Sequence, residues 1–476
     1  MKRLRTHAAL AVLLLPALLT SMDLSILFVA SPTIAAELRP SATAWLWIMD
    51  VYGFVMAGLL ITMGALGDRF GRRRMLLGGA ALFGTASALL ALADSPAWLI
   101  AGRALLGVGG ATLAPSTLSL LRSLYPGERE RRAAVAAWTV AFTGGAVAGP
   151  IVGGLLLEHF WWGSVFLINV PVMLVLLVAA PLLVPESRAA EPTPFDLPGA
   201  VLSLAALFGL VYAIKQVAEE PREAAVAGAV GAAAAVAFAV RQRRAAHPLL
   251  DLGLLRRPLF ASAVLANTVM TLAVAGLGAL AFTLLQTVHG MGPLEAALWA
   301  LPTIAGTFAG AGLASAVGER VRPAVPLAGG LLVSAAGFVV VATQTAEPWM
   351  FIAGYTVVTF GVGVTGTAAN ALVLTAAPPE RAGTAAGLSE TSTELGAALG
   401  IAVLGTLATE VYRRAMDAVA PGTPAAETVA AAPHLPEARA AFVDGLTVAA
   451  STAAVALTLI ALLLALWVGR GAVRKA

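Results

Sequence analysis

The sequence predicts an all-α, polytopic membrane protein, and three observations lead to that fold class. Hydrophobic residues make up 59% of the 476 residues and charged residues only 12%, with a mean hydropathy of +0.87. An ordinary soluble domain has roughly 25% charged residues. Apolar stretches of about 20 residues, the length that crosses a bilayer as a helix, recur along the whole chain. Arginines gather in alternate connections between these stretches.

Fourteen apolar stretches are predicted as membrane helices, because lipid offers no hydrogen-bond partner for an unpaired backbone group. In chain order they cover residues 8–31, 44–66, 75–93, 97–121, 133–157, 163–184, 197–216, 223–240, 259–287, 293–316, 324–343, 348–375, 383–409 and 441–468. The basic start "MKRLRTH" before the first stretch is also typical of a secretory signal. The apolar run continues past Ala30 and many spans follow, which favours an uncleaved first helix.

Positive charge orients these helices, since Lys and Arg accumulate in cytoplasmic connections. Most of the 30 Lys and Arg residues fall on the side that also holds the N-terminus, for example Arg72–Arg74 and Arg241–Arg244. With an even number of spans, both termini are expected in the cytoplasm of a bacterial-type inner (plasma) membrane. One outer connection, at about 410–440, is long. Short amphipathic helices and a partly disordered polar loop both fit its Ala-rich, charged sequence.

Several functional classes find no support in the residues. The chain has no cysteine, which excludes disulfides and thiolate chemistry, and its five histidines lack metal-ligand spacing. It has no P-loop motif and no nucleophile with a matching base, so neither ATP use nor an enzyme is predicted. A basic, aromatic-interleaved surface for nucleic acid is also missing. We therefore expect no cofactor and no metal.

An internal repeat divides the chain. The segments "ALGDRFGRRRMLLGG" (65–79) and "AVGERVRPAVPLAGG" (316–330) align without a gap, and they fall after the second and tenth spans on the same membrane side. Duplicated halves are a common plan of transporters. We predict an N-terminal six-helix bundle (1–184), an inserted helix pair with its linkers (185–258) and a C-terminal six-helix bundle (259–476).

Three motifs carry a resemblance to a known family. "GALGDRFGRRR" (64–74) resembles the cytoplasmic loop motif of the major facilitator superfamily. "LIAGRALLGVGGA" (99–111) is similar to its fourth-span arginine motif, except that Leu106 stands where Gln is usual. "GGAVAGPIVGGLL" (144–156) resembles the antiporter motif of the fifth span. With "MDLSILFVASP", "LWIMDVYGF" and "WWGSVFLINVP", the match is to fourteen-helix drug:proton antiporters of the type that exports quaternary ammonium compounds and dyes.

The resemblance implies a major facilitator fold and a proton-coupled multidrug efflux antiporter. Its expected partners are small lipophilic cations, protons and the lipid bilayer, its energy source is the proton gradient, and its expected state is a monomer. Export of an endogenous antibiotic or metabolite on the same scaffold is an alternative. A non-transporting membrane receptor is a second alternative, which acids at several separate helix positions make less attractive.

Ionised side chains within a span are costly and persist mainly where they face a cavity or a partner. Five are found here: Asp23, Asp50, Arg103, Glu390 and Glu394. A carboxylate in such a place can exchange a proton for a cationic substrate, so the four acids are candidates for proton and cation coupling. Arg103 is the candidate that tunes a neighbouring acid. For each residue the alternative is a structural role, and for Asp50 it is exposure to water at the outer membrane surface.

Two glycine-containing segments complete the candidate site. The cytoplasmic gating loop comprises Gly64, Asp68, Arg69, Gly71 and Arg72; the resemblance implies that Asp68 approaches the start of span 13, near Ala382–Thr384. The antiporter motif comprises Gly145, Gly149, Pro150, Gly153 and Gly154. Its small residues at every fourth position are expected to form a seam with Gly306, Gly310 and Ala314 of span 10, and generic close packing of helices is the alternative.

Overall fold

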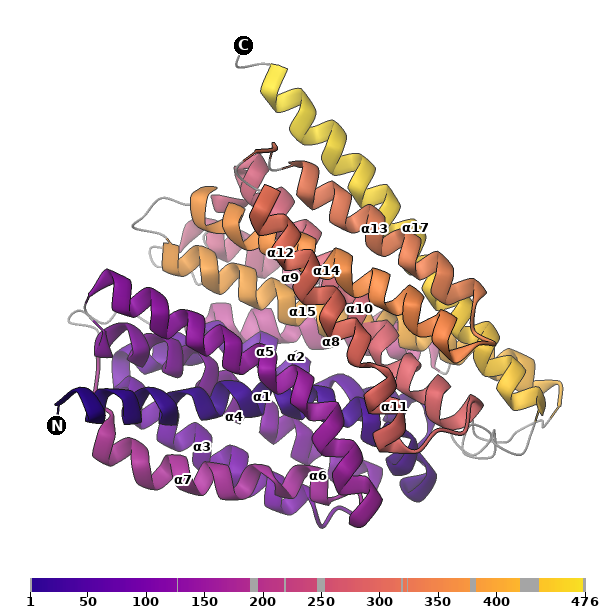
Figure 1. Cartoon of the computed structure of the whole chain (residues 1–476), viewed down its shortest axis with the longest axis horizontal. Coiled ribbons are helices and arrows are strands. Elements are labelled where there is room, and N and C mark those ends of the chain that lie inside the picture. Colours follow the sequence, from indigo (N-terminus) through magenta and orange to yellow (C-terminus); the bar gives the residue numbers. More distant parts are fainter. Residues whose placement is uncertain are drawn as a thin grey trace. The chain divides into compact units, whose positions relative to one another are not determined.

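The structure is a computed structural model that describes residues 2–125, 127–188, 196–217, 220–245, 253–317, 320–322, 324–376, 382–419 and 436–473. Every regular element in these ranges is a helix, which confirms the predicted all-α fold (Figure 1). Within the described chain, 13 helices are long and apolar enough to cross a membrane. Helix α3 (Arg72–Leu90), whose first turn holds three arginines, lies at the remaining predicted span.

The helices follow the predicted spans closely. Those up to the inserted pair are α1 (Lys2–Leu38), α2 (Ala42–Phe70), α3, α4 (Pro96–Leu124), α5 (Glu128–His159), α6 (Ser164–Leu167), α7 (Asn169–Leu183), α8 (Leu197–Gln216) and α9 (Pro221–Arg244). Those that follow are η1 (Leu254–Arg256), α10 (Pro258–Thr283), η2 (Leu284–Val288), α11 (Pro293–Trp299), α12 (Leu301–Val317), α13 (Ala324–Thr343), α14 (Pro348–Ala376), α15 (Ala382–Asp417) and α17 (Pro436–Val473).

Two predicted spans each comprise two consecutive helices. The sixth is divided at Ile168 into α6 and α7, and the tenth is divided at Ala300 into α11 and α12. Pro302 fits the second division, because a proline has no amide hydrogen to donate to the carbonyl of the residue four positions earlier, here Leu298. Between α6 and α7, Ile168 keeps helical dihedral angles (φ −59°, ψ −25°), and Asn169 follows as the first residue of α7.

The chain divides into two compact units. The first comprises Met1–Phe208, Ala245–Leu249 and Gly292–Ala297, and the second comprises Gly209–Arg244, Leu250–Met291 and Leu298–Ala476. The division passes through α8, so the inserted pair contributes to both units. The predicted domain boundaries after residues 184 and 258 stay predictions.

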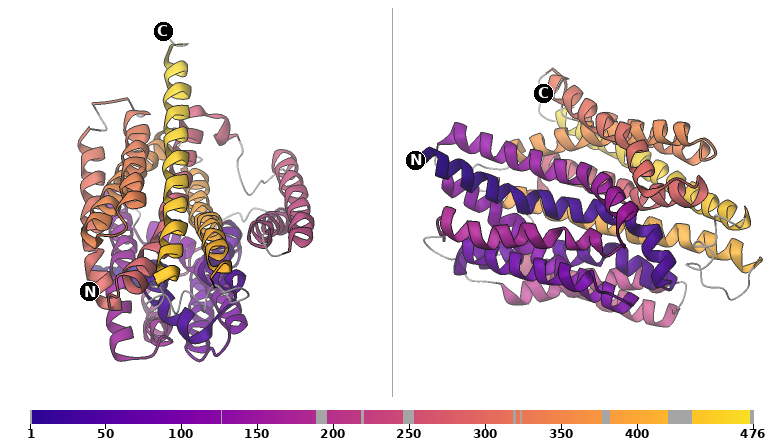
Figure 2. Two further views of the ribbon diagram at one scale, coloured as in Figure 1. Left: turned by 90° about the vertical axis from the view of Figure 1, so that its right-hand side faces the viewer. Right: turned by 60° about the horizontal axis from the view of Figure 1, so that its bottom comes forward.

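In the first unit, α1 and α5 lie side by side along much of their length (Figures 1 and 2). Helices α2 and α3 both pack on α4, and α7 packs on α3 and α1. In the second unit, α14 packs between α12 and α13, while α15 packs on α10 and α17. Each unit thus buries a core between its own helices.

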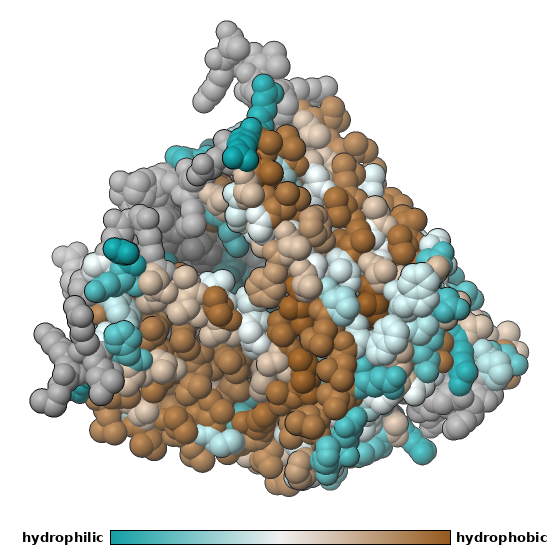
Figure 3. Space-filling view, in the orientation of Figure 1, coloured by the Kyte–Doolittle hydropathy of each residue, from teal (hydrophilic) through white to brown (hydrophobic). Residues whose placement is uncertain are grey.

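The outward surface is apolar, as a lipid-facing surface must be. Figure 3 shows hydrophobic side chains over much of the visible face, with hydrophilic residues gathered towards its margins. Large exposed hydrophobic residues occur on several helices, among them Val140, Val178, Leu182, Val236, Leu463 and Leu466. This pattern agrees with a multi-pass membrane protein.

Candidate functional site

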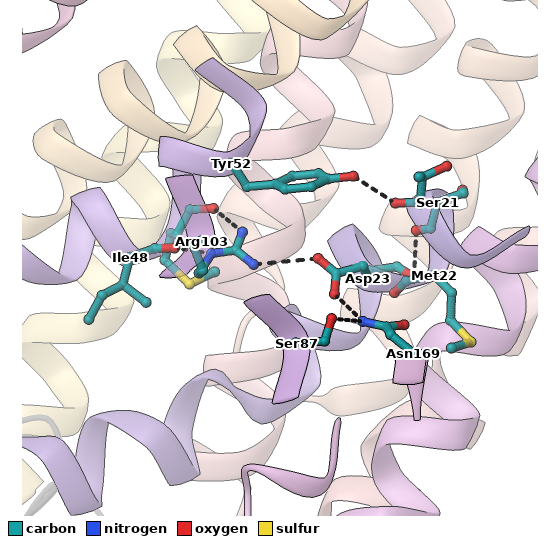
Figure 4. A network of polar contacts seen from close by, with 11 residues as sticks. Ser21, Met22, Asp23, Ile48, Tyr52, Ser87, Arg103 and Asn169 are labelled. Atoms are coloured by element: carbon teal, nitrogen blue, oxygen red, sulfur yellow. Dashed lines mark hydrogen bonds and ion pairs between the residues drawn. The ribbon is translucent and has the colours of Figure 1, made fainter. Parts of the chain in front are cut away.

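A buried ion pair lies in the middle of the first unit, between α1 and α4 (Figure 4). The side chains of Asp23 and Arg103 are both fully buried, and Arg103 Nη1 lies 3.7 Å from Asp23 Oδ2. This distance is too long for a hydrogen bond, and neither of the two atoms has a hydrogen-bond partner among the residues that the structure describes. The two charges therefore attract one another without being locked together by a hydrogen bond.

The guanidinium of Arg103 is held mainly by the backbone of α2. Its Nε donates to the carbonyl of Ile48 at 2.6 Å and its Nη2 to that of Met49 at 3.3 Å. The Tyr52 ring lies 5.4 Å from the guanidinium carbon, and the Tyr52 hydroxyl donates to the carbonyl of Thr20 on α1 at 3.3 Å. Arg103 thus links α4 to α2, and Tyr52 links α2 to α1.

Asp50 follows directly after the two carbonyls that Arg103 contacts. Its side chain is buried, with 1% of the residue exposed, and its charge interacts with that of Arg103. The first unit therefore brings Asp23, Asp50 and Arg103 into one neighbourhood. A water-exposed Asp50 at the membrane surface, the alternative open from the sequence, does not fit this burial.

Asn169, at the start of α7, is a member of this network that the sequence did not single out. Its amide nitrogen donates to Asp23 Oδ1 at 3.0 Å and to the Ser87 hydroxyl of α3 at 3.2 Å. The residue is fully buried, and within the described part of the chain its Oδ1 has no hydrogen-bond partner. The motif "WWGSVFLINVP" contains this residue, but only the tertiary fold shows that it faces Asp23.

The two glutamates belong to the second unit, on one face of α15. Glu394 is 7% exposed, and its Oε2 is buried with no hydrogen-bond partner in the described ranges, while Glu390 is half-buried. Next to them, the Asn267 amide of α10 donates to the Thr393 hydroxyl at 2.6 Å. Gly396 lets the backbone of Thr268 approach α15 closely. The structure thus buries Glu394 and half-buries Glu390 on a helix that packs against a polar stretch of α10.

The gating loop forms a tight turn between α2 and α3. Asp68 Oδ1 accepts from Arg72 at 2.7 Å (Nη2) and 2.8 Å (Nε). Gly71 has a φ of +110°, a conformation that strongly favours glycine. Gly64 and Arg69 lie on α2, and Arg69 is exposed. Asp68 is predicted to approach the start of α15 near Ala382–Thr384. The side chains of these three residues are outside the described part of the chain, so that contact stays a prediction.

Glu186 is a second residue that the sequence did not reveal, and it caps this loop from the segment after α7. Its Oε1 accepts from the Arg73 amide at 2.9 Å, and the Arg72 amide donates to the Ser187 carbonyl at 2.9 Å. A carboxylate at a helix N-terminus is stabilised by the unpaired amides and the helix dipole. A Cβ at Gly71 would lie 2.8 Å from Glu186 Cδ, so only glycine leaves room for this cap.

The glycines of spans 5 and 10 pack closely against helices of their own unit, and the predicted seam between these two spans stays a prediction. A Cβ on Gly149 would meet the Ser25 hydroxyl and would lie 2.8 Å from the Met22 carbonyl oxygen, both on α1. Gly145 and Gly153 face α1 as well, and Gly310 faces the backbone of α14. These small residues allow close helix packing inside each unit. Of the motif residues, Gly154 instead approaches the backbone of Leu294, and Pro150 lies inside α5.

Residues 13–401 match the family described as the Major Facilitator Superfamily. The chain belongs to the major facilitator superfamily. It is therefore a membrane transporter rather than an enzyme, as the sequence motifs indicated. The fold agrees: a crystal structure of a bacterial homologue of the human lysosomal transporter Spinster superposes with a TM-score of 0.69 over 97% of both chains, at 18% identity.

Three relatives place this transporter among efflux proteins. It is 44% identical to the multidrug efflux pump LfrA of Mycolicibacterium smegmatis, with 94% of each chain covered. It is 34% identical to the methyl viologen resistance protein SmvA of Salmonella typhimurium, over 85% of this chain and 82% of the relative. It is 37% identical to a tetracenomycin C resistance and export protein of Streptomyces glaucescens, over 82% of this chain and 73% of the relative.

Proposed function

We propose that this transporter is a proton-coupled multidrug efflux antiporter that exports lipophilic mono- and divalent cations by alternating access. The observation that carries the proposal is the set of buried carboxylates with few strong partners. Asp23 meets its counter-charge at 3.7 Å only, and Glu394 has a buried oxygen without a hydrogen bond. Buried acids that are not fully neutralised by a cation of the protein are suited to bind either a proton or a cationic substrate.

The relatives support the class of substrate. LfrA is named a multidrug efflux pump and SmvA a methyl viologen resistance protein, and methyl viologen is a flat dication. A dication needs two negative charges, and Glu390 and Glu394 lie four residues apart on one helix face. We expect them to supply these charges, with Asp23 and Asp50 as the acids of the first unit.

The transport cycle that we propose uses the proton gradient alone. Protons entering from outside protonate the acids and release the cation, and loss of those protons to the cytoplasm restores the binding state. The protein works in the inner (plasma) membrane with both termini in the cytoplasm. The Asp68–Arg72 pair and the Glu186 cap then lie at the cytoplasmic surface, where they stabilise one end of the conformational change.

Proteoliposomes test this proposal directly. Purified protein is inserted into vesicles that contain a pH-sensitive dye. When a cation such as ethidium or methyl viologen is added outside, transporters that carry it inwards should move protons out of the lumen. The Glu390→Gln, Glu394→Gln double variant is the control and should bind methyl viologen weakly. Cation transport with no accompanying proton movement at any pH would contradict proton coupling.

Export of an endogenous antibiotic is a second candidate, because the tetracenomycin C resistance and export protein is a relative at 37% identity. Tetracenomycin-like aromatic polyketides are not dications. A panel of dyes, biocides and polyketides in a host without its own pumps separates the two functions. Resistance to uncharged polyketides without resistance to cations would favour the second candidate.

A further inference from the structure

Asp23 is surrounded by groups that suit its charged form. Arg103 of α4 supplies only hydrogen-bond donors, since a guanidinium has no acceptor. A carboxylate that takes up a proton becomes a donor itself and then needs an acceptor. A buried acid that changes its protonation state therefore requires one neighbour that can act in both ways, because an unpaired buried polar group is costly.

The side-chain amide of Asn169 has this property. It carries a donor end, Nδ2, and an acceptor end, Oδ1, separated by a half-turn about one bond. In the structure the donor end faces Asp23 Oδ1 at 3.0 Å, while the acceptor end is buried and has no hydrogen-bond partner among the described residues (Figure 4). The unused acceptor is the observation that needs an explanation, since buried polar atoms are nearly always hydrogen-bonded.

Ser87 completes the arrangement. Its hydroxyl accepts from Asn169 Nδ2 at 3.2 Å, and a hydroxyl can rotate to donate instead. If the amide turns over, Oδ1 can accept from a protonated Asp23 and from Ser87 together. The contacts between α1, α3 and α7 are then kept in both states, and only the orientation of the amide differs.

The other charged or titratable groups near Asp23 come from two helices. Arg103 projects from α4, and α2 contributes Tyr52 and Asp50, both close to Arg103. The part of α5 packed against this stretch of α1 presents glycines, and α6 (Ser164–Leu167) has no charged residue. Among these neighbours, Asn169 is the side chain that already contacts the carboxylate through a hydrogen bond and also offers a free acceptor.

We infer that Asn169 is a positioning residue that follows the charge of Asp23, donating through Nδ2 to the carboxylate and accepting through Oδ1 from the carboxylic acid. The inference rests on the proposed function, because it requires that Asp23 exchange a proton during transport. It adds Asn169, the first residue of α7, to the coupling site.

The test measures the protonation of Asp23 itself, without substrate. Infrared difference spectra of the purified transporter over a pH series show the carboxyl band of Asp23, assigned by its loss in Asp23→Asn. A hydrogen bond to a charged group is stronger than one between neutral groups. Asn169→Leu therefore destabilises the carboxylate form of Asp23 more than its protonated form. The midpoint of protonation should rise by about half to one pH unit.

Two further variants keep the test decisive. Asn169→Asp has nearly the shape of the native side chain and puts a second carboxylate beside Asp23; the pair should hold one proton and move the midpoint up by more than about one unit. Asn267→Leu is the matched control, because Asn267 is also a membrane-span amide but bonds to Thr393 rather than to an acid. It should leave the Asp23 midpoint unchanged.

The outcomes separate this inference from the proposed function. An unchanged midpoint in a folded Asn169→Leu or Asn169→Asp protein overturns the role of Asn169. A shifted midpoint in Asn267→Leu as large as that in Asn169→Leu also overturns it, because the effect would then be general. Absence of proton release in the vesicle assay contradicts the proposed function instead. The infrared titration of Asp23 does not depend on transport, so it still tests the contact with Asn169.

Discussion

Replacing Gly149 by Ala should force α1 and α5 apart at the turn that carries Asp23. The new Cβ would lie 2.8 Å from the Met22 carbonyl oxygen and 3.1 Å from the Ile26 amide nitrogen, and ordinary contacts begin at 3.4 Å. The backbone must therefore yield by about 0.6 Å, the shortfall at Met22. The Ser25 side chain that also meets the new Cβ can rotate, but the carbonyl of a packed helix cannot.

The matched control is Gly144→Ala, five residues away on the same helix. A Cβ at Gly144 meets nothing within 4 Å. Both substitutions gain the helix propensity of Ala over Gly, roughly 1 kcal/mol, so that term cancels in the comparison. The remaining difference is the cost of overpacking, about 1–3 kcal/mol against Gly149→Ala.

Thermal unfolding of the two variants in detergent, with ethidium efflux in cells, measures the difference. Gly144→Ala should melt at or above the temperature of the native protein and keep efflux. Gly149→Ala should melt at a lower temperature and lose efflux, because its displaced helix carries Asp23. Equal melting temperatures for the two variants would refute the close contact between Gly149 and the α1 backbone.

Three further predictions concern charge. Asp68→Asn should slow transport by about tenfold, the equivalent of roughly 1.4 kcal/mol, while dye binding to purified protein is kept; equal loss of binding would exclude a gating role. Glu186→Ala should lower the melting temperature by removing a helix cap worth about 0.5–2 kcal/mol, and Glu186→Gln should do so less, as differential scanning fluorimetry can show. Because proton and cation compete for one charge, affinity should fall at acidic pH, and Glu390→Gln should flatten this dependence most, then Asp23→Asn, then Glu394→Gln. Equilibrium binding of a monovalent and a divalent dye over a pH series measures this dependence of affinity on pH. If the dependence is unchanged in all three variants, Asp50 is left as the candidate for the coupling acid.

The sequence alone was sufficient for the features that depend on local composition. Segments of about 20 apolar residues must become helices in lipid, because no other single segment satisfies its backbone hydrogen bonds there. The helix ends follow from residues such as Pro96 and Pro258, which begin α4 and α10. The charged residues inside spans were visible for the same reason, since they are rare and costly in that setting.

Which residues face one another was decided by the tertiary structure. Asn169 and Glu186 are an ordinary amide and an ordinary acid in sequence, and their roles appear only because α7 and its following segment pack against Asp23 and the start of α3. The glycines of α5 show the same limit: their spacing predicts a close helix contact, but not that the partner is α1. Periodicity fixes the face that a helix presents, whereas the identity of its neighbour depends on how all the helices share the available space.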